Sequence, residues 1–271
     1  MKTTLRICVL ALVIIFAFLV GTGWSKEIIK LKPISPIKIK PSQSIQINKS
    51  RGYLLKLYLD SNNHKTFYCG CSFDSKHHIN KEECSLNLHK VKSKHEAMLT
   101  WDRVVPVTAF GPRLDCWRSE NQLCKNSGVK KPSRGWACCR NVSKKFNEME
   151  SDMHNLVPVV RKLKKVRSYR RHGFVFGEMR MHGGCDIEFG GRAMEPKESI
   201  RGDIARIHFY MSYLYKIPLS KSQEEMLRSW NRADPPDEWE MGRNSLVEMI
   251  QGNRNPFVDQ HDLVNRIPSF R

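Results

Sequence analysis

Asp102 is the first residue whose type and surroundings suit chemistry. It lies in residues 98–111, MLTWDRVVPVTAFG, where apolar residues flank a Trp-Asp-Arg triplet. Such a stretch is typical of a strand that carries one carboxylate to the edge of a site. The residue after it is Arg103. Because a guanidinium has a pKa above about 12, Arg103 cannot accept a proton near neutral pH.

A second candidate is the basic run at residues 161–171, RKLKKVRSYRR, with seven basic residues in eleven. Such a run is often only a solvated face. Here an aromatic residue, Tyr169, stands among the charges, which suits a phosphate backbone and an unstacked base. The run favours nucleic-acid binding without sequence-specific reading, and its candidate contacts are Arg161, Lys162, Lys164, Lys165, Arg167, Arg170 and Arg171.

Strands and helices must position these residues. The sequence predicts strands at residues 53–59, 66–71 and 100–107, the last with Pro106 near its end. Residues 142–156 have a helical period that places Phe146, Met149, Met153 and Leu156 on one arc and Glu148, Asp152 and Asn155 on the opposite, polar arc.

Further helices are predicted at residues 200–215 and 223–231, with breaks at Pro218 and at residues 235–236. Pro256 is expected to end the last helical pattern. Strands and helices mix without regular alternation, and no repeat occurs. The fold class predicted from this order is α+β.

Composition favours a folded protein with an anionic partner. The 271 residues are 40% hydrophobic, enough for an ordinary core. Lysine and arginine number 46 against 27 aspartates and glutamates, a net charge of +19 with a pI near 9.7. Nucleic acid, polyphosphate or an anionic membrane surface are therefore the favoured partners.

The N-terminus has the pattern of a secretory signal at residues 1–25. Lys2 and Arg6 precede an apolar run at residues 7–20, and small residues follow at Gly21, Gly23 and Ser25. The run is short for a membrane span, so we expect cleavage and no stable span afterwards, with an uncleaved anchor as the alternative. Residues 26–51, rich in Ile, Lys and Pro, are expected to form an extended linker.

Cysteine usage agrees with export. Beyond Cys8, inside the apolar run, eight cysteines remain, and an even number behind a signal indicates up to four disulfides whose pairing is open. Zinc is the alternative, but a Cys-Gly-Cys and an adjacent pair lack the spacing that structural zinc sites favour. The eight are Cys69, Cys71, Cys84, Cys116, Cys124, Cys138, Cys139 and Cys185.

Several stretches, in this order along the chain, resemble the bacterial endonuclease I family, secreted or periplasmic nucleases of the ββα-metal (His-Me finger) type. They are Tyr68-Cys-Gly-Cys71, Trp101-Asp-Arg-Val-Val-Pro106, Phe110-Gly111, Cys116-Trp-Arg118, Met149-Glu-Ser-Asp-Met-His-Asn-Leu-Val-Pro158, Arg201-Gly-Asp-Ile-Ala-Arg206, Phe209-Tyr-Met211, Trp230, Asp234-Pro235, Trp239-Glu240, Arg243 and Gln251-Gly-Asn-Arg-Asn-Pro-Phe257. The resemblance implies a single disulfide-stapled domain at residues 52–257, followed by a tail at residues 258–271.

The resemblance also implies site residues. The family's metal-binding Glu corresponds to Asp102, which is shorter by one methylene, and its second metal ligand corresponds to Asn155. Its general-base His corresponds to Arg103, and its phosphate-contacting Arg to Arg118. The cofactor implied is one divalent cation, usually Mg²⁺, whose preference is for oxygen ligands. His95, His154 and His172 are alternative bases.

A second departure from the family lies at residues 161–169. Where the family typically has Gly-Glu-Val-Asn-Gly-Asp-Arg-Ser-Asn, residues 161–169 are mostly cationic, and only Arg167 and Ser168 match. We therefore expect a secreted or periplasmic monomer that acts on the backbone of DNA or RNA with impaired metal-dependent cleavage. The alternatives are an inactive nucleic-acid binder on the same scaffold and a protein that docks on anionic membranes.

Overall fold

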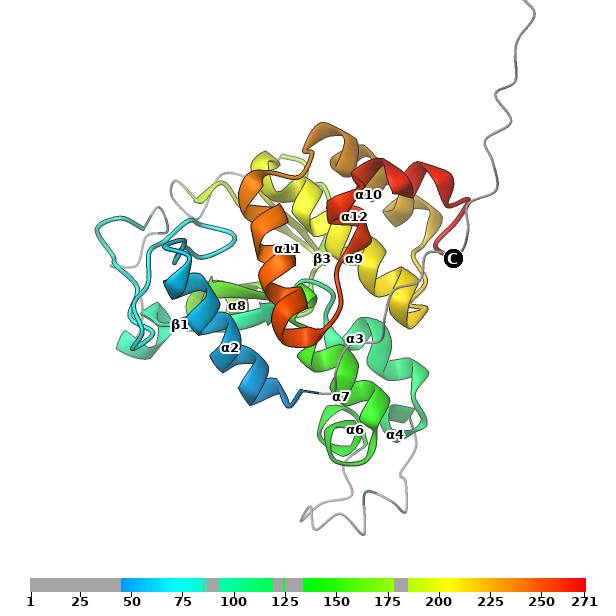
Figure 1. The fold of residues 1–271 in the computed structure, drawn as a ribbon, viewed down its shortest axis with the longest axis horizontal. Coiled ribbons are helices and arrows are strands. Elements are labelled where there is room, and N and C mark those ends of the chain that lie inside the picture. The colour runs from blue at the N-terminus through cyan, green and yellow to red at the C-terminus, as the bar shows by residue number, and fades with distance from the viewer. Residues whose placement is uncertain (1–44, 85, 87–92, 119–123, 125–133, 178–184) are drawn as a thin grey trace, which may run out of the picture. The chain divides into compact units, whose positions relative to one another are not determined.

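The structure is a computed structural model that describes residues 45–84, 86, 93–118, 124, 134–177 and 185–271 (Figure 1). The chain divides into two compact units, Met1–Ile37 and Lys38–Arg271, and every described residue belongs to the second. The predicted signal and residues 26–44 of the predicted linker lie outside the described residues. Among the described helices, none combines the length and apolarity that a membrane crossing requires.

The two strands at the centre of the fold are β1 (Leu99–Arg103) and β2 (Leu156–Val160), which pair antiparallel with Arg103 opposite Leu156. All five β2 residues are buried, as expected of an apolar strand covered on both faces. Helix α8 (Arg161–Arg167) follows β2 directly and contacts both strands. The strand predicted at residues 100–107 thus exists but ends at Arg103, before the turn at Pro106.

Helix α2 (Ile47–Asp60) corrects two predictions. The strand expected at residues 53–59 is wrong, and residues 47–51, expected to be extended, are helical. The buried positions of α2 are separated by three or four residues, which fits one face of a helix and not alternate sides of a strand; they are Ser50, Leu54, Leu57 and Tyr58.

The helix predicted at residues 142–156 ends early, as α7 (Lys144–Ser151), and α6 (Trp136–Val142) precedes it. A short 3₁₀ turn, η3 (Met153–Asn155), then leads into β2, and the Asp152 side chain caps it by accepting a bond from the backbone of His154. The predicted apolar arc is buried, but so are Asp152 and Asn155 on the arc expected to be polar. Their burial follows from the chain leaving the helix at Asp152.

The C-terminal part is helical and comprises η5 (Glu198–Ile200), α9 (Arg201–Tyr215), α10 (Lys221–Ala233), α11 (Glu238–Gln251), α12 (Pro256–Asp259) and η6 (His261–Arg266) (Figure 1). The two helices predicted here are confirmed as α9 and α10. Pro256 begins a helix and does not end one: its missing N–H costs nothing at the first helical position, and the Asn255 side chain caps the turn. Residues beyond 258 also enter the core through Leu263, Val264 and Phe270.

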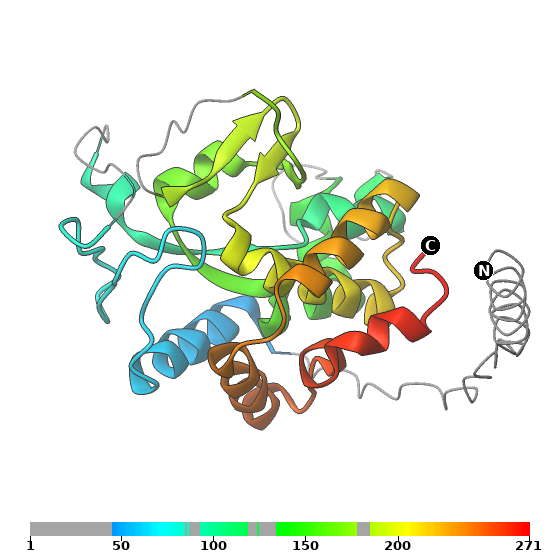
Figure 2. The same cartoon turned by 90° about the horizontal axis from the view of Figure 1, so that it is seen from above.

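The remaining elements are small. A second sheet has the order β3 (Arg171–His172), β5 (Ala193–Glu195) and β4 (Glu188–Gly190), seen in yellow-green in Figure 2. Between β1 and α6 the described segments include α3 (Val107–Phe110), η2 (Gly111–Arg113) and α4 (Asp115–Arg118), and η1 (Lys94–Ala97) precedes β1. The strand predicted at residues 66–71 is wrong, because this segment is a turn next to the isolated bridge between Lys65 and Ser72. The α+β class is confirmed.

All eight cysteines form disulfides, which are Cys69–Cys185, Cys71–Cys84, Cys116–Cys139 and Cys124–Cys138. The disulfide prediction is confirmed, and the zinc alternative is wrong for these residues. Cys69–Cys185 spans 116 positions and joins the turn beside Tyr68 to the segment before β4. The other three close much shorter loops.

The long-range disulfide should stabilise the fold most. Loop-closure entropy predicts that removing Cys69–Cys185 by Ser substitutions lowers the free energy of unfolding by about 2 kcal/mol more than removing Cys71–Cys84 the same way. The reason is the difference between separations of 116 and 13 positions. Urea titrations of the two double variants, under oxidising conditions, measure this difference. Equal losses would contradict it.

Candidate active site and nucleic-acid interface

The neighbours Asp102 and Arg103 project to opposite sides of β1, as successive strand residues do. Each is buried and each meets an opposite charge. The Asp102 carboxylate bonds to Nη1 of Arg167, at the end of α8. The same guanidinium donates to the carbonyl oxygens of Arg103 and Val104, both at 2.8 Å. Arg167 therefore joins α8 to the end of β1.

Arg103 pairs with Glu150 of α7 on the other side. Its Nη2 lies 3.0 Å from Glu150 Oε2, and its Nε donates to the Glu150 backbone oxygen at 2.8 Å. Burial lowers the pKa of Arg103 to about 10 in spite of this acid. Arg103 is therefore still protonated at neutral pH, and its charge is held by α7.

Two more arginines surround the same carboxylate. Arg140 of α6 donates to both oxygens of Glu150, at 2.7 and 3.0 Å, and Trp136 Nε1 donates to Oε2 at 2.9 Å. Arg51 of α2 interacts electrostatically with both Arg140 and Glu150. Burial acts to raise the pKa of Glu150, but these bonds and cations bring it below its ordinary value. We call Arg51, Arg103 and Arg140 the arginine cluster.

Asn155, the expected second metal ligand, lies in η3 and is fully buried. Its Oδ1 accepts from the Val105 backbone N–H at 2.7 Å, and its Nδ2 donates to the Val105 oxygen at 2.9 Å. The side chain thereby extends the pairing of β1 and β2 by one residue. Its amide oxygen, the donor that a metal would need, is already used.

The residues present do not fit a divalent cation in this arrangement. Asp102 is bonded to Arg167, Asn155 is bonded to Val105, and two oxygens are few for Mg²⁺. Within the described ranges, no three His, Cys, Asp or Glu side chains gather as a metal-binding group. Arg103, the residue expected at the base position, is paired with Glu150 instead.

Arg118, the expected phosphate contact, lies at the end of α4 and pairs with Asp115 at 2.7 Å. Its side chain is 60% exposed, so it is open to a ligand. No contact described in the structure joins it to Asp102 or Asn155. Its role as a phosphate contact stays a prediction.

The three alternative bases lie elsewhere. His95 is exposed in η1. His154 is buried, with Nε2 3.0 Å from the Asn253 oxygen and its ring against Tyr210. His172 is buried beside Tyr68 and His208. None of them forms a described contact with Asp102 or Arg103, so the structure brings no replacement base to this position.

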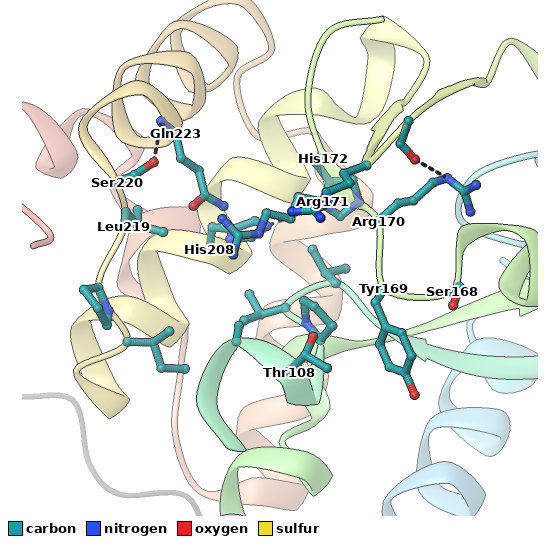
Figure 3. Close-up of a pocket in the computed structure, with 18 residues that line it drawn as sticks. Thr108, Ser168, Tyr169, Arg170, Arg171, His172, His208, Leu219, Ser220 and Gln223 are labelled. Carbon is teal, nitrogen blue, oxygen red and sulfur yellow. Dashed lines mark hydrogen bonds between the residues drawn. The ribbon is translucent and has the colours of Figure 1, made fainter. Parts of the chain in front are cut away.

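A cleft of about 1040 Å³ opens beside the end of β1 (Figure 3). One wall is the segment after Arg103, and another is residues 168–172, which follow α8. Helix α9 and the segment leading into α10 complete it. The lining residues are Val104, Val105, Pro106, Thr108, Ala109, Ser168, Tyr169, Arg170, Arg171, His172, Gly191, Arg192, His208, Ile217, Pro218, Leu219, Ser220 and Gln223.

Cationic and aromatic side chains line this cleft. Arg171 and Arg192 are both exposed, and the backbone N–H of Arg171 bonds to the Arg192 oxygen at 3.0 Å, so the two lie together. Neither side chain forms an ion pair or hydrogen bond with another described residue. Tyr169 is 67% exposed beside them. Charge and an exposed ring are what a phosphate backbone and an unstacked base require.

The residues of the predicted basic run therefore differ in their surroundings. Arg170 and Arg171 line the cleft, although Arg170 also bonds to the oxygens of Val166 and Gly191. Arg161 and Lys162 are half-buried, Lys165 pairs with Glu96 at 3.3 Å, and Lys164 donates to the Trp101 oxygen at 2.6 Å. Arg167 is 1% exposed. The surface contact predicted for Arg167 is wrong, because its charge is used inside the protein by Asp102.

At the wall of the cleft, His172 and His208 form a buried row with Tyr68. Tyr68 Oη lies 3.2 Å from His172 Nε2, and His172 Nδ1 lies 3.4 Å from His208 Nε2. Burial, with the nearby charge of Arg167, lowers the pKa of His208 to about 3 and holds that of His172 well below its ordinary value. Both imidazoles are therefore neutral at neutral pH.

Comparison with known proteins agrees with this architecture. The Endonuclease I family matches residues 39–262, most of the chain and all the elements that build the site. The chain belongs to the endonuclease I family. Members of this family are generally dependent on a divalent metal.

Curated endonuclease I relatives cover nearly the whole described chain. A periplasmic deoxyribonuclease of Aeromonas hydrophila is 32% identical over 231 residues, 83% of this chain and 90% of the relative. An extracellular deoxyribonuclease of the same organism is 34% identical over 200 residues, 72% and 80% of the two chains. Endonuclease-1 of Buchnera aphidicola subsp. Acyrthosiphon pisum is 32% identical over 213 residues, 77% and 79%. The expected secreted or periplasmic location is confirmed.

Sequence reasoning missed several residues of this endonuclease I-like site. Glu150 lies inside residues 149–158, a stretch that resembles the family, and this resemblance could have marked it as a site residue. Arg51 was assigned to a linker. Nothing in the local sequence pattern marks Trp136, Arg140 or Arg192. The partner of Trp136 and Arg140 is Glu150, which lies in another element.

The buried histidines should make the protein labile to acid. Because the His208 pKa is below its unfolded value of about 6.5, the unfolded state binds more protons below that pH, so stability is full above pH 6.5 and falls toward pH 3. His208→Gln should reduce the slope of unfolding free energy between pH 6 and 4 by about 1.4 kcal/mol per pH unit. Chemical denaturation across this range measures it. The exposed control His95→Gln should leave the slope unchanged, and equal slopes for both variants would refute the assignment.

Proposed function

We propose that this endonuclease I-family protein binds the phosphate backbone of DNA or RNA without sequence specificity and that its metal-dependent cleavage is impaired. The observation that carries the proposal is the Arg103–Glu150 ion pair. A cation fixed at the position that corresponds to the family's base cannot deprotonate water. Loss of a general base typically costs about 10²–10⁴-fold in rate.

The hydrogen bonds of the two expected metal ligands support the same proposal. Asp102 and Asn155 would be the ligands of a divalent cation, which supplies charge stabilisation to a phosphodiester reaction in such nucleases. Both side chains are committed to protein partners instead. The buried cations Arg103 and Arg167 also disfavour a further positive charge nearby.

Binding is supported by charge and by shape. The chain carries a net charge of +19, and the cleft presents Arg171, Arg192 and Tyr169. Arginine binds phosphate oxygens with two parallel hydrogen bonds, and an exposed tyrosine ring stacks on bases of any identity. The relatives' printed names, deoxyribonuclease and Endonuclease-1, are consistent with a nucleic-acid ligand.

A second candidate is a nucleic-acid binder with no cleavage at all. The engagement of both metal-ligand candidates favours it, because a cation would have to displace Arg167 from Asp102 and the Val105 backbone from Asn155. In both candidates the protein binds nucleic acid. They differ in whether residual nicking is measurable.

The test is an incubation of the full, disulfide-intact protein with supercoiled plasmid and with RNA, in Mg²⁺, in Mn²⁺ and in EDTA. We expect a gel shift in all three, weakening with salt, and plasmid nicking at least about 100-fold below that of the Aeromonas periplasmic deoxyribonuclease assayed beside it. Nicking at the relative's rate would refute impairment. Absence of any shift, with binding to anionic vesicles that excess DNA does not compete, would replace nucleic acid by a membrane partner.

Restoring the family residues should raise cleavage. In Asp102→Glu/Arg103→His, an imidazole replaces the fixed cation and the carboxylate regains its methylene. We expect metal-dependent nicking to rise at least about tenfold above the unaltered protein, since a general base contributes about 10²–10⁴-fold. Asp102→Glu alone is the control and should show no rise. No gain from the double change, in a variant that circular dichroism shows to be folded, would show that the cationic α8 segment also closes the metal position.

The cleft should account for part of the binding. Arg171→Gln/Arg192→Gln removes two exposed charges that have no described protein partner, so folding should be preserved. For duplex DNA, the magnitude of the slope of log K against log salt should fall by about 1.8, and affinity at 0.1 M salt should fall at least about tenfold. Lys76→Gln, an exposed charge outside the cleft, is the control. Equal behaviour of the two variants would exclude the cleft as the interface.

A further inference from the structure

The arginine cluster has more positive charge than its acid can neutralise. The guanidinium groups of Arg103 and Arg140 both bond to the single carboxylate of Glu150. Helix α2 contacts α7, and Arg51 on α2 lies within electrostatic reach of Arg140 and Glu150. The Arg103 and Glu150 side chains are 8% and 1% exposed, so water screens them little. A charge without a counter-charge in such surroundings is unfavourable in free energy. Binding of an external anion there is therefore favourable.

The Glu150 carboxylate is bonded to residues other than Arg51. Its Oε1 accepts one bond, from Arg140, and its Oε2 accepts three, from Arg103, Arg140 and Trp136, at 2.7 to 3.0 Å.

Arg51 is left without a partner among the described residues. Its Nε is buried and has no hydrogen bond, and no ion pair to its guanidinium is formed within the described ranges. Burial, and then the charge of Arg140, lowers the pKa of Arg51. The helix α2 that carries it is anchored by buried residues on both sides of it in sequence, Ser50 and Leu54. Arg51 thus extends from an anchored helix, and its buried Nε has no acceptor among the described residues.

We propose that Arg51, with the adjacent Arg140, binds one phosphate group of the nucleic-acid backbone. The inference deepens the proposed function and rests on it. Arginine's planar fork matches two phosphate oxygens, and a phosphodiester brings the negative charge that the cluster lacks. Arg140 is 38% exposed on its side chain, so the site opens to solvent. Lys164, whose pKa is lowered by burial and then by the charges of Arg103 and Arg51, adds a further cation within electrostatic reach.

The site differs from the cleft and from the metal-ligand candidates. It lies between α2, α6 and α7, at the Glu150 side of β1, whereas Asp102 faces Arg167 on the other side. The cluster includes Arg103 itself. Arg103, at the position that corresponds to the base, would therefore help to bind a phosphate and would not activate water.

The test compares Arg51→Gln with Lys56→Gln in the full chain. Lys56 lies on the same helix and pairs with Asp60 at the surface, and its substitution by Gln removes the same charge. With a fluorescein-labelled oligothymidylate, anisotropy titrations across salt concentrations give Kd and its salt slope. Arg51→Gln should reduce the slope by about 0.7 and weaken binding about fivefold at 0.1 M salt. Lys56→Gln should change Kd less than about twofold.

A second variant and a second probe keep the proposal testable if Arg51→Gln folds poorly. Arg51→Lys retains the charge but loses the fork, so we expect a preserved salt slope with weaker affinity. Inorganic phosphate, compared with chloride at equal ionic strength, should raise the melting temperature of the unaltered protein and of Lys56→Gln, but not of Arg51→Gln.

The outcomes separate the two proposals. If the unaltered protein fails to bind the oligonucleotide, the proposed function is wrong. If it binds but Arg51→Gln behaves like Lys56→Gln, the proposed function stands and the Arg51 site is refuted. If phosphate stabilises through Arg51 while oligonucleotide binding is indifferent to it, the site takes free phosphate, which overturns its assignment to the backbone.

Discussion

Two ion pairs on opposite sides of β1 fix the centre of this protein. Asp102 binds Arg167 and Arg103 binds Glu150, so one strand is tied to α8 on one side and to α7 on the other. Removing one partner of a buried pair typically costs about 3–5 kcal/mol, because the remaining charge stays buried alone. Neither Asp102 nor Arg103 can exchange its ion-pair partner without disturbing α8 or α7, the helices that carry those partners.

The proposed impairment of cleavage is consistent with this constraint. The side chains at the positions expected for the metal ligands and the base contribute to packing in this chain. Asn155 completes the pairing of β1 with β2, and Arg167 satisfies the carbonyl oxygens at the end of β1. Side chains that bond strands together are rigid. A rigid cationic side chain suits phosphate binding better than it suits a site where water and metal ions exchange.

The elements that the sequence predicted correctly are those with a strong local signal. Helices α9 and α10 have a clear period, and β1 lies in a contiguous family motif. Helix α2 was missed because its buried face includes Ser50 and Tyr58, and because the preceding Ile/Lys alternation and prolines favour extended structure. The end of α7 was missed because a polar residue, Asp152, becomes a buried cap.

The candidate site was predictable only in part, for a related reason. Asp102, Arg103 and Asn155 could be identified from a motif, but their partners could not. Glu150 is 47 positions from Arg103, and Arg167 is 65 positions from Asp102. The charge balance of a site depends on such long-range pairs. Whether a basic residue is exposed, as Arg171 is, or forms a buried ion pair, as Arg167 does, depends on where the chain folds back.

The nesting of the disulfides has a consequence for biogenesis. Cys124–Cys138 lies within the span of Cys116–Cys139, and Cys69–Cys185 encloses both as well as Cys71–Cys84. A chain that enters an oxidising compartment from its N-terminus exposes Cys69 long before Cys185. Oxidation in order of emergence would join Cys69 to Cys71 or Cys84. Reaching the native set of disulfides therefore requires either delayed oxidation or thiol–disulfide exchange. Where exchange is the route, maturation depends on the isomerase capacity of the compartment.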